Sequence, residues 1–140
     1  MTFKHEFVEF IPDQLETDTL YISVPHRTAI HKCACGCGVE VVTPISPTDW
    51  RMTFDGETVS LSPSIGNWSY PCRSHYWIKR GRVVWAEDWS VEEIRDARAL
   101  DRSRKAEYYS ELKDRQHSKQ TDSRRPRNAL QRVWHWIKST

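Results

Sequence analysis

Six potential metal donors, including all four cysteines of the chain, fall in two short segments: His31, Cys33, Cys35 and Cys37 in the first, and Cys72 and His75 in the second. Thiolate sulfur and imidazole nitrogen are the usual zinc donors in proteins. The donors of the first segment occupy alternate positions, so they face one side if the strand that carries them continues. Gly36 and Gly38 allow tight backbone turns around an ion. Residue types and spacing therefore predict bound Zn²⁺.

The number of donors exceeds the four that a tetrahedral zinc site needs, so some of them have other roles. His31 competes for a place in the ligand set. Ser74 lies between two donors, where it is either a hydrogen-bond partner of nearby groups or a nucleophile. The simpler alternative is a set of buried, reduced cysteines, which pack as small hydrophobes. The ligands that we expect are Cys35, Cys37, Cys72 and His75.

A zinc site of this kind is compatible with two kinds of function. Four protein ligands make a closed structural site, whereas three leave a position for water, whose pKa zinc lowers to about 7. A hydrolase also needs a group that shuttles the proton. Glu9 is the candidate, because it lies an even number of residues from His5 and both can face the cluster from one strand. From spacing alone, an exposed surface pair is the simpler interpretation.

The segment from Pro63 to Trp68 also contains residues suited to chemistry. Ser64 and Asn67 offer hydroxyl and amide donors for a developing oxyanion. The alternative is a tight turn packed by Trp68.

The spacing of apolar residues along the sequence predicts the strands and helices that must position these residues. Over residues 5–84, short apolar or alternating runs separated by turn residues indicate strands. Asp55-Gly56 and Arg80-Gly81 are dipeptides that suit hairpin turns. We expect an antiparallel sheet with strands near residues 5–11, 20–24, 28–33, 39–43, 51–54, 58–61, 75–79 and 82–85.

At Ser90 the spacing of apolar residues changes from that of strands to that of a helix. Ser90-Val-Glu-Glu93 is a capping box, in which Ser90 and Glu93 satisfy each other's backbone donors at a helix start. The elements that we expect here are a helix over 90–116, a polar linker over 117–127 and a short helix over 128–138. The predicted architecture is α+β: a compact, antiparallel, β-rich zinc-binding domain at residues 1–89 and a basic helical extension at residues 90–140.

Composition limits the classes of partner. No apolar run approaches the roughly 20 residues that span a bilayer, and the first residues lack the pattern of a secretory signal, so we expect a cytoplasmic location and no membrane partner. In that reducing compartment, closely spaced cysteines favour a metal over disulfides. Residues 1–89 carry 8 Lys/Arg and 11 Asp/Glu, whereas residues 90–140 carry 13 and 8. Mixed signs along a helix indicate a solvated face, so nucleic-acid binding has only charge behind it and is not expected.

Several longer motifs carry a likeness to a known family. In chain order they are His5-Glu-Phe-Val-Glu-Phe-Ile-Pro12, His31-Lys-Cys-Ala-Cys-Gly-Cys-Gly38, Ser46-Pro-Thr-Asp-Trp50, Thr53-Phe-Asp-Gly-Glu57, and Pro63-Ser-Ile-Gly-Asn-Trp68 leading to Pro71-Cys-Arg-Ser-His-Tyr-Trp77. Over about residues 3–89 the chain resembles a small bacterial family described as CEHH-type hydrolases. The motifs recur in order, which makes the likeness specific.

The resemblance implies a zinc-dependent peptidase, encoded in operons with ubiquitin-like proteins and their E1-like and E2-like conjugating enzymes, in settings linked to phage defence. Its implied task is to cleave a ubiquitin-like modifier from a precursor or a target. The family label refers to a Cys, a Glu and two His. The matches in this chain are one of the cluster cysteines, Glu9, His31 and His75.

Two functional hypotheses follow. In the first, the chain is a metal-dependent peptidase or isopeptidase in which zinc-bound water attacks and Glu9 moves the proton, with His31 and Ser74 as further catalytic candidates. In the second, the chain is a non-catalytic zinc module that docks a ubiquitin-like protein or its conjugating enzymes. An open coordination position beside Glu9 favours the enzyme, and four protein ligands favour the module.

Overall fold

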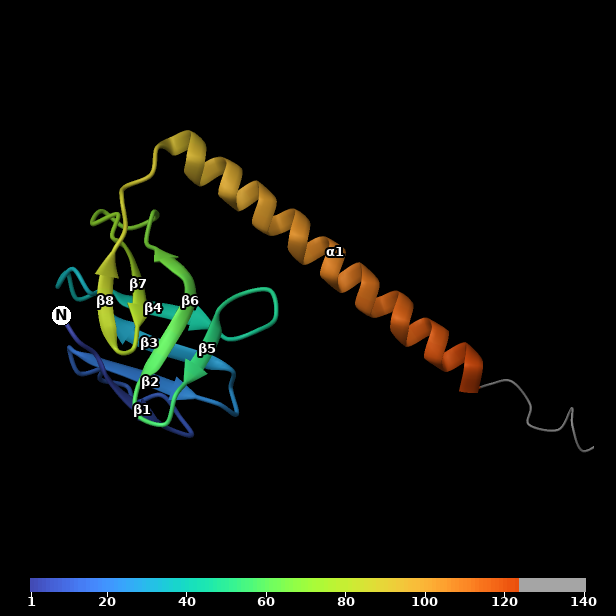
Figure 1. Ribbon diagram of the computed structural model, residues 1–140, viewed down its shortest axis with the longest axis horizontal. Coiled ribbons are helices and arrows are strands. Elements are labelled where there is room, and N and C mark those ends of the chain that lie inside the picture. The colour runs from blue at the N-terminus through green and yellow to red at the C-terminus, as the bar shows by residue number, and fades with distance from the viewer. Residues whose placement is uncertain (124–140) are drawn as a thin grey trace, which may run out of the picture. The chain divides into compact units, whose positions relative to one another are not determined.

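The computed structural model describes residues 1–123, in which eight strands precede one helix, α1 (Figure 1). The first four strands are β1 (Lys4–Phe7), β2 (Thr19–Ser23), β3 (Thr28–Lys32) and β4 (Glu40–Pro44). The next four are β5 (Arg51–Phe54), β6 (Val59–Gly66), β7 (His75–Lys79) and β8 (Arg82–Trp85), and α1 spans Val91–Ser123. All eight predicted strands are present, although the first ends earlier and the sixth ends later than expected.

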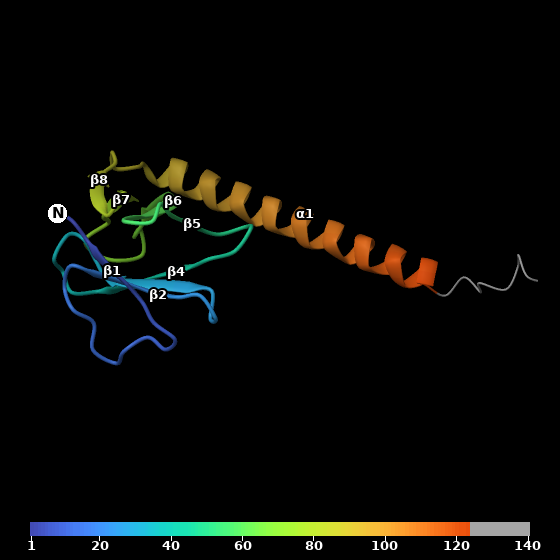
Figure 2. The same cartoon turned by 60° about the horizontal axis from the view of Figure 1, so that its bottom comes forward.

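The strands form two four-stranded sheets, in the orders β1-β2-β3-β4 and β5-β6-β7-β8, which lie in two layers (Figure 2). The predicted single antiparallel sheet needs correction, because there are two sheets and β1 runs parallel to β2, with Lys4 beside Thr19. The remaining strand pairs are antiparallel. Parallel neighbours need a crossover rather than a tight turn, and residues 8–18 supply it.

A hydrophobic core fills the space between the two layers. Its buried members include Leu20, Ile22 and Ala29 from the first sheet, and Val59, Leu61, Ile65, Tyr76 and Ile78 from the second. Along β6 the buried residues are separated by more exposed ones, as expected of a sheet with one buried face. Burying one large aliphatic side chain contributes about 1.5–3 kcal/mol, so this core holds the sheets face to face.

Backbone contacts also tie the two sheets together at their edges. The Phe3 N–H donates to the Gly81 carbonyl, in the turn between β7 and β8, at 2.7 Å. Ile45, which directly follows β4, forms a β-bridge with Trp50 just before β5. The N-terminal segment and the β4–β5 connection therefore both pass from one sheet to the other.

Local turn and cap chemistry confirms two sequence predictions. Asp55 Oδ1 accepts the backbone N–H groups of Glu57 at 3.0 Å and Thr58 at 2.6 Å, which closes the β5–β6 turn. In the capping box, the Glu93 N–H donates to Ser90 Oγ at 3.2 Å and the Ser90 N–H donates to Glu93 Oε2 at 2.8 Å. Helix α1 therefore begins where the sequence indicates.

Helix α1 continues past its predicted end and includes residues 117–123, which were expected to be linker. This segment is polar but contains neither Gly nor Pro, so nothing in it breaks a helix. The rest of the predicted linker and the predicted helix at 128–138 lie outside the described residues. Contacts divide the chain into units of residues 1–99 and 100–140. No helix in the described region has the length and apolar character needed to cross a membrane.

His31 in β3 is part of the core, with 0% of its surface exposed. Its Nε2 shares a hydrogen bond of 2.9 Å with the Tyr76 hydroxyl, and its ring meets Phe3 edge-on at 4.9 Å. Within the described part of the chain, His31 Nδ1 has no hydrogen-bond partner. Burial lowers the pKa of His31 to about 4, so the imidazole is neutral at pH 7.

This burial predicts a loss of stability in mild acid. The pKa of His31 lies near 4 in the folded chain and near 6.5 in the unfolded chain, so the unfolded chain binds more protons between these values and stability falls as the pH decreases. His31→Asn does not titrate. Denaturant unfolding at pH 7 and pH 5 should show the wild type losing about 2 kcal/mol more than this variant. Equal losses in the two chains would contradict a buried neutral imidazole.

Candidate functional site

The four cysteine thiols converge in one cluster. Cys33, Cys35 and Cys37 lie on the loop between β3 and β4, and Cys72 lies on the loop between β6 and β7. All four Sγ atoms lie within 4.8 Å of one another. Cys33 Sγ is 3.3 Å from Cys35 Sγ and 4.0 Å from Cys72 Sγ. Loops from both sheets thus contribute to this group, which we call the sulfur cluster.

Glycine conformations and short backbone hydrogen bonds shape the first loop. Gly36 and Gly38 have φ values of 85° and 80°, in the left-handed region that side chains disfavour. The Cys33 N–H donates to the Val39 carbonyl at 2.7 Å, and the Gly36 N–H donates to the Cys33 carbonyl at 3.0 Å. These bonds close the loop, so its three cysteines gather on the side of Cys72.

The sulfur cluster fits a tetrahedral metal ion. Four thiolates bound to zinc at about 2.3 Å lie ~3.8 Å apart, and the two sulfur separations given above are close to that value. In the described part of the chain, this group of donors contains cysteines alone, with neither histidine nor carboxylate. Four thiolates form a closed site of the structural type.

Buried polar groups contact the cluster. The Ser74 hydroxyl lies 3.0 Å from Cys33 Sγ, and Asn67 Nδ2 donates to Ser74 Oγ at 2.9 Å. The Ser74 backbone N–H lowers the pKa of Cys72 to about 7, which favours the thiolate that a metal binds. Ser74 and Asn67 are therefore engaged with the sulfur atoms. The Asn67 amide was expected to stabilise an oxyanion, but it donates to the Ser74 hydroxyl beside the sulfur cluster instead.

A second constellation lies on the opposite face of β7. Ser74 and Tyr76 point toward the core, so the intervening His75 points outward. There His75 Nε2 lies 2.9 Å from Ser64 Oγ, and His75 Nδ1 lies 2.8 Å from the Glu87 carbonyl oxygen. His75, the first residue of β7, thus contacts Ser64 of β6 on one face, while Ser74, directly before β7, contacts the sulfur cluster on the other.

The Glu87 carbonyl fixes the tautomer of His75. A carbonyl oxygen only accepts hydrogen bonds, so Nδ1 carries the proton and Nε2 of the neutral ring has its lone pair toward Ser64. The Ser64 hydroxyl therefore donates to Nε2. A nucleophilic serine and its general base require this direction of the hydrogen bond.

An irregular register in β6 brings Ser64 to this position. Leu61 pairs with Ile78 and Ile65 pairs with Tyr76, so three residues of β6 stand opposite one residue of β7. Extra residues in one strand bend it and redirect its side chains, which is why bulges occur beside active sites.

Tryptophan rings enclose His75. Trp68 and Trp89 meet its ring edge-on at 4.8 and 5.0 Å, and they stack on each other at 5.7 Å. Gly66 permits this packing, because a Cβ at this position would overlap the Trp68 indole. His75 is only 5% exposed as a result, whereas Ser64 remains half-buried and accessible.

Residues 7–86 match a protein family described as "Bacterial ubiquitination-like system serine protease (BubE)". This match covers more than half of the chain. The chain belongs to the BubE family. The description agrees with the expected link to bacterial ubiquitination-like systems but does not support the CEHH-type label. No curated protein and no solved structure matches the chain.

In this BubE family member, the predicted metal ligands separate into two groups. Three of them join the sulfur cluster: Cys35, Cys37 and Cys72. Cys33, which was not among the favoured ligands, is the fourth member. The two histidines lie outside the cluster, since His31 contacts Tyr76 in the core and His75 contacts Ser64 on the outer face.

The structure does not bring Glu9 to the cluster. Glu9 is exposed beyond the end of β1, and its carbonyl accepts the Ser23 hydroxyl at 2.6 Å. Ser23 pairs with Thr28 at the start of β3, whereas Cys33 follows the end of that strand. Five residues of extended chain, about 16 Å, therefore separate Glu9 and the cluster along the sheet.

The sequence did not indicate that Ser64 pairs with His75. No Gly-x-Ser-x-Gly motif surrounds it, and its partner lies on the next strand. Only the β6–β7 register brings the two together, and the irregular pairing in β6 hides that register from a reading of the sequence.

The BubE family description says nothing of a metal, so the metal centre is tested by measuring the zinc content of the protein. Protein purified under reducing conditions should hold about one zinc ion per chain by elemental analysis. Cys33→Ser should lose the metal and melt at a lower temperature, because it removes a ligand of a closed site. His75→Gln should keep the metal, because the imidazole lies on the other face of β7. Zinc retained by Cys33→Ser and lost by His75→Gln would instead support the ligand set that includes His75.

Proposed function

We propose that this chain is a serine-type peptidase, with Ser64 as the nucleophile and His75 as the general base. The observation that carries the proposal is the 2.9 Å hydrogen bond between Ser64 Oγ and His75 Nε2, whose direction is fixed by the Glu87 carbonyl on Nδ1. The BubE family description, which names a serine protease, supports the same chemistry.

The reaction proceeds through an acyl-enzyme. Ser64 Oγ attacks the scissile carbonyl carbon while His75 Nε2 takes the hydroxyl proton. The C–N bond then breaks, and the imidazolium gives its proton to the departing amine. Water, activated by the same imidazole, hydrolyses the Ser64 ester and restores the hydroxyl. The Glu87 carbonyl keeps the ring oriented by accepting a hydrogen bond from Nδ1–H throughout, and the Nδ1 proton stays on the ring.

The metal has a structural role in this proposal. Zinc bound to the four cysteines would supply a rigid crosslink between the loops that follow β3 and precede β7. A zinc-bound water with Glu9 as its base has less support, because four thiolates close the site and Glu9 lies beyond the opposite end of β3.

The substrate class follows from the family. Because the family description places a serine protease in a bacterial ubiquitination-like system, we infer that the substrate is the ubiquitin-like protein of that system, released from a precursor or from a target. The E1-like and E2-like conjugating enzymes are then functional partners of the chain.

A docking module is the alternative function. The closed set of four thiolates favours it, because such sites stabilise folds and bind no substrate. The Ser64–His75 pair favours the enzyme, since a module needs no oriented base beside a hydroxyl.

The two functions predict different kinetics for single substitutions. Wild type should cleave a fusion of the operon's ubiquitin-like protein, and Ser64→Ala should reduce kcat by at least about a thousandfold. His75→Gln should cost about a hundred- to ten-thousandfold, the usual contribution of a general base. Glu9→Gln is the control and should cleave at the wild-type rate.

Folding and zinc content must be unchanged in all three variants. Full activity of Ser64→Ala together with an inactive Glu9→Gln would support zinc-bound water as the nucleophile. A wild type that binds the ubiquitin-like protein without cleaving it would support the docking module.

A further inference from the structure

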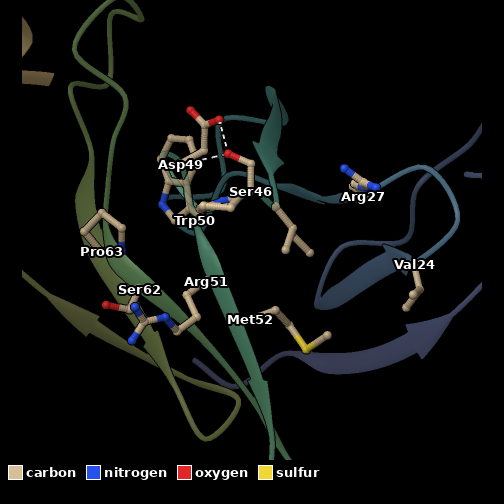
Figure 3. Close-up of a pocket in the computed structure, with 11 residues that line it drawn as sticks. Val24, Arg27, Ser46, Asp49, Trp50, Arg51, Met52, Ser62 and Pro63 are labelled. Carbon is tan, nitrogen blue, oxygen red and sulfur yellow. Dashed lines mark hydrogen bonds between the residues drawn. The ribbon is translucent and has the colours of Figure 1, made fainter. Parts of the chain in front are cut away.

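A pocket of about 630 Å³ has Ser62 and Pro63, the two residues before the proposed nucleophile, in its wall (Figure 3). Its wall includes Arg27 from the β2–β3 turn, Trp50 just before β5, Arg51 and Met52 from the start of β5, and Pro63 from β6. Ligand sites commonly have volumes of about 300–1,000 Å³, so this pocket has room for a side chain and part of a peptide backbone.

The pocket and Ser64 share a stretch of backbone. Pro63 lines the pocket and directly precedes Ser64, so their Cα atoms are within about 3.8 Å. An extended peptide advances about 3.3 Å per residue. A substrate that presents a carbonyl to Ser64 therefore reaches the pocket within a few residues of the scissile bond.

The charge of the pocket is positive. Arg27 and Arg51 lie on different sides of it in Figure 3, and neither forms an ion pair with any carboxylate in the described part of the chain. The one carboxylate in the wall, that of Asp49, accepts a hydrogen bond of 2.6 Å from the Ser46 hydroxyl.

The backbone holds both arginines in place. The Arg27 carbonyl accepts the Ile45 N–H at 2.8 Å, which ties the β2–β3 turn to the end of β4. Arg51 pairs with Ser62 in the β5–β6 ladder. The two guanidinium groups are therefore carried on ordered backbone, and Trp50, Met52 and Pro63 add apolar surface to the wall of the pocket.

We propose that this pocket binds a carboxylate of the peptide substrate through Arg27 and Arg51. Guanidinium groups recognise carboxylates through charge-assisted, paired hydrogen bonds. The carboxylate belongs either to an acidic side chain near the scissile bond or to the C-terminus of the peptide. The inference rests on the proposed function only for the identity of the ligand as a substrate, because binding itself needs no Ser64 hydroxyl.

Peptide binding to the full-length Ser64→Ala chain tests the proposal without turnover. The probes are eight-residue, C-terminally amidated peptides with Glu at successive positions, their Gln counterparts, and the Gln peptide with a free C-terminus. A Glu peptide should bind at least about tenfold more tightly than its Gln counterpart, as measured by calorimetry. If the C-terminal carboxylate is the ligand, the free-acid Gln peptide should bind at least about tenfold more tightly than its amide, while Glu adds nothing.

Substitutions locate the binding site. Arg51→Gln should remove the preference for the carboxylate, and so should Arg27→Asn, which tolerates the positive φ of 51° at that position. Arg82→Gln is the matched control, because Arg82 lies in β8 at the opposite edge of the same sheet, and it should change nothing.

Equal binding of charged and neutral peptides would overturn the proposal, and so would a preference that survives in Arg51→Gln. Tighter binding of an oligonucleotide than of any peptide, lost in the arginine variants, would also overturn it. Because these measurements use a chain without the Ser64 hydroxyl, their failure leaves the peptidase proposal intact. Failure of cleavage by the wild type leaves the binding result intact.

Discussion

The convergence of loops from two sheets on one sulfur cluster is the constraint on which the rest of the site depends. Cys33 follows the last residue of β3, whereas Cys72 lies on the loop that leads into β7. The Ser74 hydroxyl extends the contact by approaching Cys33 Sγ, and Ser74 directly precedes His75. A crosslink at this point therefore limits the movement of the histidine that stands on the other face of the same strand. In a chain of modest size, a metal held in this way would add stability that a small core supplies only in part.

The outer face combines three features around His75. The Glu87 carbonyl selects the tautomer, Trp68 and Trp89 exclude water from the ring, and Ser64 occupies the remaining nitrogen. A carbonyl carries only a partial charge, so an imidazolium at His75 would gain less stabilisation here than beside a carboxylate. The family description agrees with a serine-protease role for the outer face, and the four clustered thiols account for the pattern of metal donors in the sequence.

Local features of the structure were predictable from the sequence, but the pairing of distant strands was not. The turn at Asp55 and the cap at Ser90 depend on residues within three positions of each other, and both predictions are confirmed. The parallel pairing of β1 with β2 depends on a crossover whose path no local pattern reveals. For the site, the donor types correctly indicated a cluster, but alternation alone could not tell which histidine faces inward. Ser74 faces the cysteines and β7 begins with the next residue, so the alternation of side chains along the chain turns His75 away from them.

A covalent probe tests the central claim, that the inner cluster supports a serine nucleophile on the outer face, more directly than kinetics. A fluorophosphonate reacts only with a serine whose hydroxyl is activated by a neighbouring base. Intact mass spectrometry with peptide mapping should find one adduct per chain, on Ser64, in the metal-loaded protein. The rate of labelling should fall when a chelator removes the metal. An adduct on Ser74, or active protein that stays unlabelled, would contradict the assignment of Ser64, and labelling unaffected by chelation would contradict the role given to the cluster.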